Sequence, residues 1–184
     1  MTKHKIFPTP VWIIEGTPQE LIDELLQGAY KCKDNIDCQK RSNQEGYQSP
    51  SFAWNEFHPK GIKYIEGVLK EHLIDKNDDN LFINGAIAEE PLPTTWWFNI
   101  NPKGAWNIPH THPSVDFAGV LYLTDIDNEL CFISHNNRFN TGHLSPPVKK
   151  GDLIVFPSDQ IHMVMPNKSE KDRVSISMNI TITK

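Results

Sequence analysis

Three histidines have a spacing typical of a mononuclear metal site. His110 and His112 form an HxH pair, and His162 follows fifty residues later along the chain. In a strand, side chains two residues apart project from the same face, so the pair could point together into a β-barrel. An HxH pair with one distant histidine suits a mononuclear iron, copper or zinc site that keeps coordination positions open. Because HxH pairs also occur by chance, two exposed surface imidazoles are the alternative interpretation.

A second group, Arg173 and Ser175, could bind an anion. On a strand these two residues share one face and alternate with the apolar Val174 and Ile176. A guanidinium beside a hydroxyl is well suited to hold a carboxylate, and an arginine turned into a barrel without an anion would be a costly buried charge. In the alternative, Arg173 faces solvent while Val174 and Ile176 pack inward.

The chain that must position these groups has a β pattern after residue 80. Short stretches rich in β-branched and aromatic residues alternate with turn residues, which predicts an all-β sandwich or barrel. The expected strands are Leu81–Ile87, Thr94–Asn101, Asp116–Thr124, Leu130–Ser134, Asp152–Phe156, His162–Met165 and Arg173–Thr183.

The first eighty residues are expected to support this barrel from one outer face. Two prolines limit residues 6–14 to an edge strand or an extended arm. Residues 17–20, Thr-Pro-Gln-Glu, have the pattern of a helix start with a capping box. A loop is expected over residues 31–51 and a second helix over residues 59–73.

Composition excludes several classes of protein. The 184 residues carry a formal charge of -5, with 38% hydrophobic residues, as in one soluble domain without a basic surface for nucleic acid. No apolar run approaches the roughly 20 residues that span a bilayer, and no targeting segment is visible, so we expect a cytoplasmic protein with no membrane partner. Three cysteines without a CxxC pair argue against a zinc ribbon, which leaves the eight imidazoles to hold any metal. A homo-oligomer remains open.

The order HxH, then Phe-Pro with a histidine five residues after the proline, then Arg-x-Ser, resembles the double-stranded β-helix oxygenases that use iron(II) and 2-oxoglutarate. More narrowly, the chain resembles the small oxygenases of this kind in bacteria and their phages. The matching segments cover nearly the whole chain and are residues 7–12, 41–49, 99–107, 118–123, 151–157 and 173–179.

The resemblance implies a mainly β fold, a double-stranded β-helix of jelly-roll or cupin-like form with about two N-terminal supporting helices. We predict a single domain, 1–184, with an arm and helical support in 1–80 and the metal-binding barrel in 81–184. The implied function is an iron(II)- and 2-oxoglutarate-dependent dioxygenase that hydroxylates an unidentified small molecule or peptide and releases succinate and CO₂. The resemblance implies these site residues: His110, His112 and His162 for iron and catalysis; Arg173, Ser175 and Tyr122 for 2-oxoglutarate; Asn99 and Asn107 as pocket or supporting residues.

One departure from the wider superfamily is the identity of the third ligand. Most of its members have a carboxylate where this chain has His112, and a third neutral imidazole leaves one more unit of positive charge on the metal. Asp116 is the nearest carboxylate that could replace His112 if the chain bends. Two other functions stay open: a cupin-like three-histidine dioxygenase that needs no 2-oxoglutarate, and a non-catalytic barrel that binds a metal or small ligand.

Overall fold

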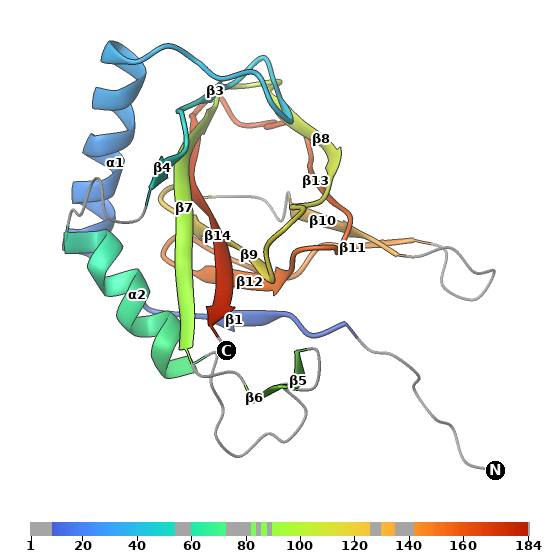
Figure 1. Ribbon diagram of the computed structural model, residues 1–184. Helices are drawn as coiled ribbons and strands as arrows, with labels where there is room; N and C mark the ends of the chain where they lie inside the picture. Colours follow the sequence, from blue (N-terminus) through green and yellow to red (C-terminus); the bar gives the residue numbers. More distant parts are fainter. Residues whose placement is uncertain are drawn as a thin grey trace.

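The structure, a computed structural model, describes residues 9–53, 60–72, 82–83, 86–87, 90–125, 130–134 and 142–183. Two antiparallel sheets face each other, and two helices cover the outer face of the larger sheet (Figure 1). This architecture confirms the expectation of a mainly β fold with two supporting helices.

The larger sheet has seven strands and runs through the middle of the molecule. Its central strand, β14 (Arg173–Thr183), pairs on one side with β7 (Glu90–Asn101) and on the other with β9 (Phe117–Tyr122). The sheet is completed by β12 (Leu153–Pro157), β1 (Trp12–Ile14), β3 (Tyr47–Gln48) and β4 (Phe52–Ala53).

The smaller sheet has five strands and forms the opposite wall. In spatial order they are β11 (His143–Leu144), β10 (Leu130–Ile133), β13 (His162–Val164), β8 (Trp106–His110) and β2 (Asn43–Gln44). A separate pair, β5 (Phe82–Ile83) with β6 (Ala86–Ile87), lies in the segment expected to be one strand, whose remaining residues are outside the described part of the chain.

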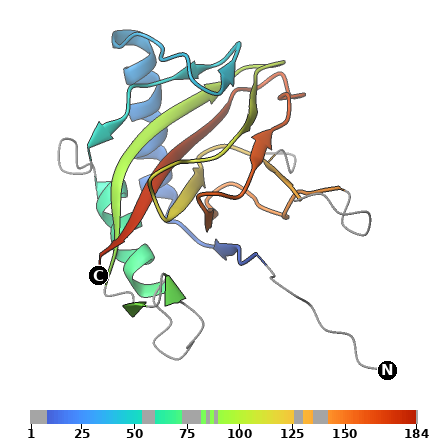
Figure 2. The same ribbon diagram turned by 45° about the vertical axis from the view of Figure 1, so that its right-hand side comes forward.

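The main hydrophobic core lies between the larger sheet and the helices α1 (Gln19–Asn35) and α2 (Lys60–His72), which Figure 2 shows behind that sheet. Fully buried side chains from α2, such as Ile62 and Leu69, meet the strand residues Phe98 and Ile176 there. A smaller apolar cluster, including Phe132 and Phe156, fills one end of the space between the two sheets.

The two faces of strand β14 differ in burial and in chemistry. Its even-numbered residues from Val174 to Ile180 pack into the helix-side core. Its odd-numbered residues, Arg173, Ser175, Ser177 and Asn179, face the space between the sheets and line a cavity. The prediction that Arg173 and Ser175 share an inward face is therefore confirmed, and Val174 and Ile176 are buried as well, on the opposite face.

Three expectations from the sequence need correction. The capping box does not form: α1 begins at Gln19, no side chain caps it, and the Thr17 backbone N–H donates to the Gly151 carbonyl instead. The loop expected over residues 31–51 starts as the last turns of α1 and contains two short strands, β2 and β3. The expected HxH strand ends at His110, so His112 lies beyond β8.

Neither of the described helices has the length and apolar character of a membrane-spanning segment.

Two glycines of α2 test how closely the helices pack. A Cβ at Gly61 would lie 2.6 Å from Cγ of the buried Leu25 on α1, whereas a Cβ at Gly67 would meet nothing within 4 Å. We expect Gly61→Ala to lower the free energy of unfolding by about 1–3 kcal/mol through overpacking.

Gly67→Ala is the matched control. It should raise the free energy of unfolding by about 0.5–1 kcal/mol, because alanine favours the helix and the position is open. Urea denaturation of both variants measures the difference. Equal effects would show that α2 does not pack on α1 as described.

Candidate active site

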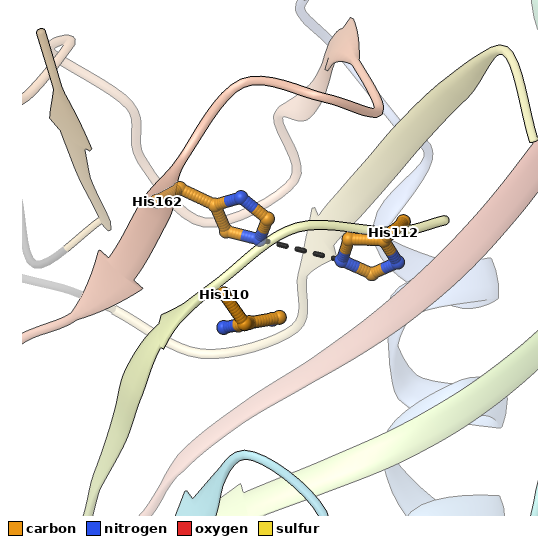
Figure 3. A group of neighbouring side chains, drawn as sticks. All are labelled: His110, His112 and His162. Carbon is orange, nitrogen blue, oxygen red and sulfur yellow. Dashed lines mark hydrogen bonds between the residues drawn. The ribbon is translucent and has the colours of Figure 1, made fainter. Parts of the chain in front are cut away.

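The three predicted histidines come together in the space between the two sheets. One possible ligand nitrogen from each of His110, His112 and His162 lies within 4.8 Å of the other two, and Figure 3 shows the three rings gathered around a common point. The Nε2 atoms of His112 and His162 are 3.3 Å apart. The alternative of two exposed surface imidazoles does not hold, since His110 and His112 are half-buried and His162 is buried.

Strand pairing and one loop contact produce this convergence. His110 at the end of β8 is the cross-strand neighbour of His162 at the start of β13. His112 follows two residues beyond β8, where its backbone N–H donates to the Ser158 carbonyl, 2.8 Å away. The rings of His110 and His162 are 4.3 Å apart, centre to centre.

Hydrogen bonds fix the orientation of all three rings. Nδ1 of His110 lies 2.7 Å from the Ile108 carbonyl, and Nδ1 of His162 lies 2.9 Å from the Gln160 carbonyl. A carbonyl oxygen can only accept, so both Nδ1 atoms carry a proton. Nδ1 of His112 lies 2.8 Å from Oδ1 of Asn179, which requires the same tautomer.

In this tautomer the Nε2 atoms of neutral rings have no proton and present lone pairs. Two such lone pairs facing each other at 3.3 Å repel unless a cation lies between them. Burial lowers the pKa of His162 to about 3 and that of His112 to about 4, and burial also lowers the pKa of His110. The rings are therefore neutral near pH 7, so a metal ion is the cation that this arrangement suits.

Aromatic side chains hold two of the rings from outside. The Trp97 ring stacks on His112 with centroids 5.8 Å apart and an interplanar angle of 20°. Phe156 meets His162 edge to face at 4.7 Å. These contacts limit rotation of the rings, which keeps their nitrogens preorganised for a ligand.

A cavity of about 510 Å³ adjoins the histidines and reaches the larger sheet. It brings the metal candidates together with all the other predicted site residues, which are Arg173, Ser175, Tyr122, Asn99 and Asn107. The volume lies in the usual range for small-molecule sites.

Arg173 lies in this cavity as a buried cation. Its side chain is 5% exposed, and Nη1 donates to the Met165 carbonyl at 3.0 Å. Burial lowers the pKa of Arg173 to about 10, so the guanidinium stays charged near pH 7. Ser175 and Tyr122 are cross-strand neighbours, and burial raises the pKa of the Tyr122 hydroxyl, which therefore stays a neutral donor.

Asn99 and Asn107 both belong to the cavity wall. Asn99 donates from Nδ2 to the Ser177 hydroxyl at 2.9 Å, and its Oδ1 is buried with no hydrogen-bond partner among the described residues. Asn107 accepts from Nδ2 of Asn101 at 3.0 Å and donates to the Ser42 hydroxyl at 3.1 Å. The amides thus link β7, β8 and the segment before β2 into one wall.

Asp116 does not replace His112. Its carboxylate accepts from the backbone N–H of Ile182 at 2.7 Å, and Asp116 belongs neither to the histidine group nor to the cavity lining. Of the other histidines, His72 and His143 are exposed and outside the group. His4, His58 and His135 lie outside the described residues.

Sequence reasoning did not single out Asn179, Trp97 or Arg41, all of which line the cavity. A signal was present for Asn179. The polar alternation that marks Arg173 and Ser175 continues through Ser177 to Asn179, and β7 shows the same alternation from Trp97 to Asn101. For Arg41 there was no periodic signal, because its segment is short and polar.

A family model described as "Putative 2OG-Fe(II) oxygenase" matches residues 129–179. The matched segment contains His162, Arg173 and Ser175, while the HxH pair precedes it. No curated protein is similar enough in sequence to count as a match.

Solved structures match the fold over nearly the whole chain. A prolyl-4-hydroxylase of Pseudomonas putida has a TM-score of 0.68 at 14% identity, covering 96% of this chain and 94% of that one. The viral collagen prolyl hydroxylase of Paramecium Bursaria Chlorella virus-1, solved as a 2OG complex, has a TM-score of 0.62 at 16% identity, covering 92% and 94%. HygX of Streptomyces hygroscopicus, solved with nickel and 2-oxoglutarate bound, has a TM-score of 0.62 at 13% identity, covering 95% and 84%.

The fold is thus that of the double-stranded β-helix oxygenases, as these structural matches show. The family match over residues 129–179 agrees with this fold, since both point to the 2-oxoglutarate/iron(II) oxygenases, oxidoreductases whose cofactors are iron(II) and 2-oxoglutarate. The resemblance first noted in the sequence is confirmed.

Asn179 provides a test of how His112 is oriented. Its Oδ1 accepts from Nδ1 of His112, and its own Nδ2 donates to the Thr95 hydroxyl at 3.0 Å. Asn179→Ala should weaken iron(II) binding about 10- to 100-fold, because the ring loses the partner that fixes its tautomer and direction. Anaerobic metal titration followed by calorimetry measures the affinity.

The control is Thr95→Val, which removes only the outer hydrogen bond and leaves Oδ1 of Asn179 in place. Its effect on iron(II) affinity should be smaller than that of Asn179→Ala. If Asn179→Ala binds iron(II) as tightly as the parent protein, Asn179 does not position His112.

Proposed function

We propose that His110, His112 and His162 are the iron(II) ligands and that Arg173, Ser175 and Tyr122 bind 2-oxoglutarate. The observation that carries the metal assignment is the convergence of one possible ligand nitrogen from each of three imidazole rings whose Nδ1 atoms all face oxygen acceptors. Oxygen acceptors of this kind commonly fix the tautomer of metal-ligating histidines.

The cosubstrate assignment rests on Arg173. A buried guanidinium on the cavity wall is suited to bind an anion, and a carboxylate matches its planar donor geometry. Ser175 and Tyr122 add two neutral hydroxyl donors on neighbouring strands. The distal carboxylate of 2-oxoglutarate would meet these donors, and its other end would lie toward the histidines.

We propose hydroxylation as the reaction. When bound, iron(II) with 2-oxoglutarate would supply hydroxylation of a substrate C–H bond by molecular oxygen, in which one oxygen atom enters the product and the other enters succinate as CO₂ is released. The chain orients the cosubstrate through Arg173 and restricts water through the apolar wall that includes Val120 and Leu130. Two of the similar structures are prolyl hydroxylases, which supports this reaction type.

We also propose a substrate class and a compartment. The substrate is a small molecule or a peptide, the protein has no nucleic-acid or membrane partner, and it acts in the cytoplasm; a homo-oligomer remains open. The formal charge of -5 and the free thiols of Cys32, Cys38 and Cys131 are compatible with these expectations. The division at residue 80 within a single domain also stays a prediction.

The histidine assignment predicts loss of metal from single variants. His110→Ala and His162→Ala should each abolish stoichiometric iron(II) binding, because two imidazoles do not hold the ion firmly. His143→Ala is the matched control, since this exposed histidine lies outside the group and should leave iron content unchanged. Iron is measured after anaerobic reconstitution and desalting, and full iron content in either site variant contradicts the assignment.

The Arg173 assignment predicts a separate effect on the cosubstrate. Arg173→Met should keep the iron but weaken 2-oxoglutarate binding about 100-fold, which corresponds to roughly 3 kcal/mol for a charge-assisted hydrogen-bonded pair. Titration of the iron-loaded protein with 2-oxoglutarate under argon gives the affinity, and succinate release in air gives turnover.

The two alternative functions predict other results in the same experiment. Unchanged 2-oxoglutarate affinity in Arg173→Met would favour a three-histidine dioxygenase that needs no cosubstrate. Absence of succinate release from the iron-loaded parent protein, with its candidate substrates present, would favour a non-catalytic barrel.

A further inference from the structure

The cavity beside the histidines has an unusual charge composition. Among the described residues that line it, none carries a carboxylate, and the permanent cations are Arg41 and Arg173. If the proposed function holds, the two negative charges of 2-oxoglutarate meet Arg173 and the metal ion. The three imidazoles are neutral, so Arg41 remains as a cation with no anion assigned to it.

Arg41 is held at the cavity by a backbone network. Its own N–H donates to Oδ1 of Asn43 at 2.9 Å. The next residue, Ser42, accepts from the backbone N–H of Ile108 at 2.9 Å and from Nδ2 of Asn107 at 3.1 Å. Ile108 lies two residues before His110, so this network ties the Arg41 backbone to the strand that carries a proposed ligand.

The Arg41 side chain has no internal partner that would explain its place. It is exposed, and its guanidinium makes no hydrogen bond or ion pair with the described part of the chain. The neighbouring Lys40 is also exposed but does not line the cavity. Of these two adjacent cations, only Arg41 is available to a ligand in the site.

The smaller sheet and the segment before β2 give the cavity an apolar wall on one side of the histidines and a polar, cationic wall on the other. Leu130 on β10 and Val164 on β13 are cross-strand neighbours and give the cavity an apolar region on one side of the histidines. Arg41 and Ser42 lie on the other side, beside β8 and next to β2. Strand β2 pairs with β8, which ends at His110, so the segment that carries Arg41 lies beside the strand of a proposed ligand.

We propose that Arg41 binds an anionic group, a carboxylate or a phosphate, of the substrate whose apolar part lies beside the histidines. This inference rests on the proposed function and names the substrate class for that site: an organic anion whose oxidisable C–H bond lies in its apolar part, away from its charge. Guanidinium suits both anions because its donors match their paired oxygens.

A binding experiment without turnover tests the proposal. Protein loaded with zinc(II), which is redox-inert, and saturated with 2-oxoglutarate is titrated with hexanoate and hexyl phosphate, and with their neutral counterparts hexanamide and 1-hexanol. Two-dimensional NMR of the arginine Nε–Hε groups and the backbone amides reports binding at Arg41 itself. The two anions show whether the site prefers a carboxylate or a phosphate.

We expect at least one anion to shift the Arg41 signals and to bind about tenfold more tightly than its neutral counterpart. Arg41→Gln should remove this preference. Lys40→Gln removes the same charge one residue away and should keep it. The initial titration with 2-oxoglutarate tests the proposed function separately, since failure to saturate at that step concerns Arg173 and the metal rather than Arg41.

Three results would overturn the proposal. They are equal binding of the anions and their neutral counterparts by the parent protein, an anion preference that persists in Arg41→Gln, and no response of the Arg41 signals to any of the four compounds.

Discussion

The site depends on three hydrogen bonds that turn the histidine rings the same way. Each Nδ1 faces an oxygen, from Ile108, Asn179 or Gln160, and each Nε2 is therefore left as a bare lone pair. In this tautomer the close approach of the His112 and His162 Nε2 atoms is repulsive, and a bound cation would relieve it. The strand pairing of β8 with β13 and the stacking of Trp97 supply the rigidity that this arrangement requires.

The larger sheet supports that arrangement by separating its two faces. On β14, apolar side chains such as Ile176 anchor the strand to the helices, which leaves the opposite face free for polar groups. Arg173 and Asn179 lie near the two ends of that polar face, and they belong to different parts of the site: Arg173 lines the cavity as the proposed anion-binding group, and Asn179 accepts a hydrogen bond from His112. Their separation is set by the strand rise of about 3.3 Å per residue, which keeps the anion site and the metal site at a fixed spacing.

Sequence reasoning predicted what depends on local periodicity and missed what depends on distant partners. The alternation around Arg173 and the apolar stretch before His162 located the strands correctly. The start of α1 was wrong because the Thr17 N–H bonds to Gly151, more than a hundred residues away. Strands β2 and β3 have two residues each, too few for any period, and form only because β8 and β7 lie beside them. For the same reason His112 was assigned to a strand, whereas its position depends on the Ser158 carbonyl.

The third imidazole changes the electrostatics of the whole cavity. A carboxylate at position 112 would cancel one positive charge of the metal and would also repel an anionic substrate close to it. His112 does neither, and the nearest candidate carboxylate, Asp116, is turned to the Ile182 backbone. The described cavity wall likewise contains no acidic side chain. A neutral ligand set, a buried Arg173 and an exposed Arg41 therefore all favour negative charge in one cavity, so the departure from a carboxylate ligand and the chemistry of the wall have a common physical explanation.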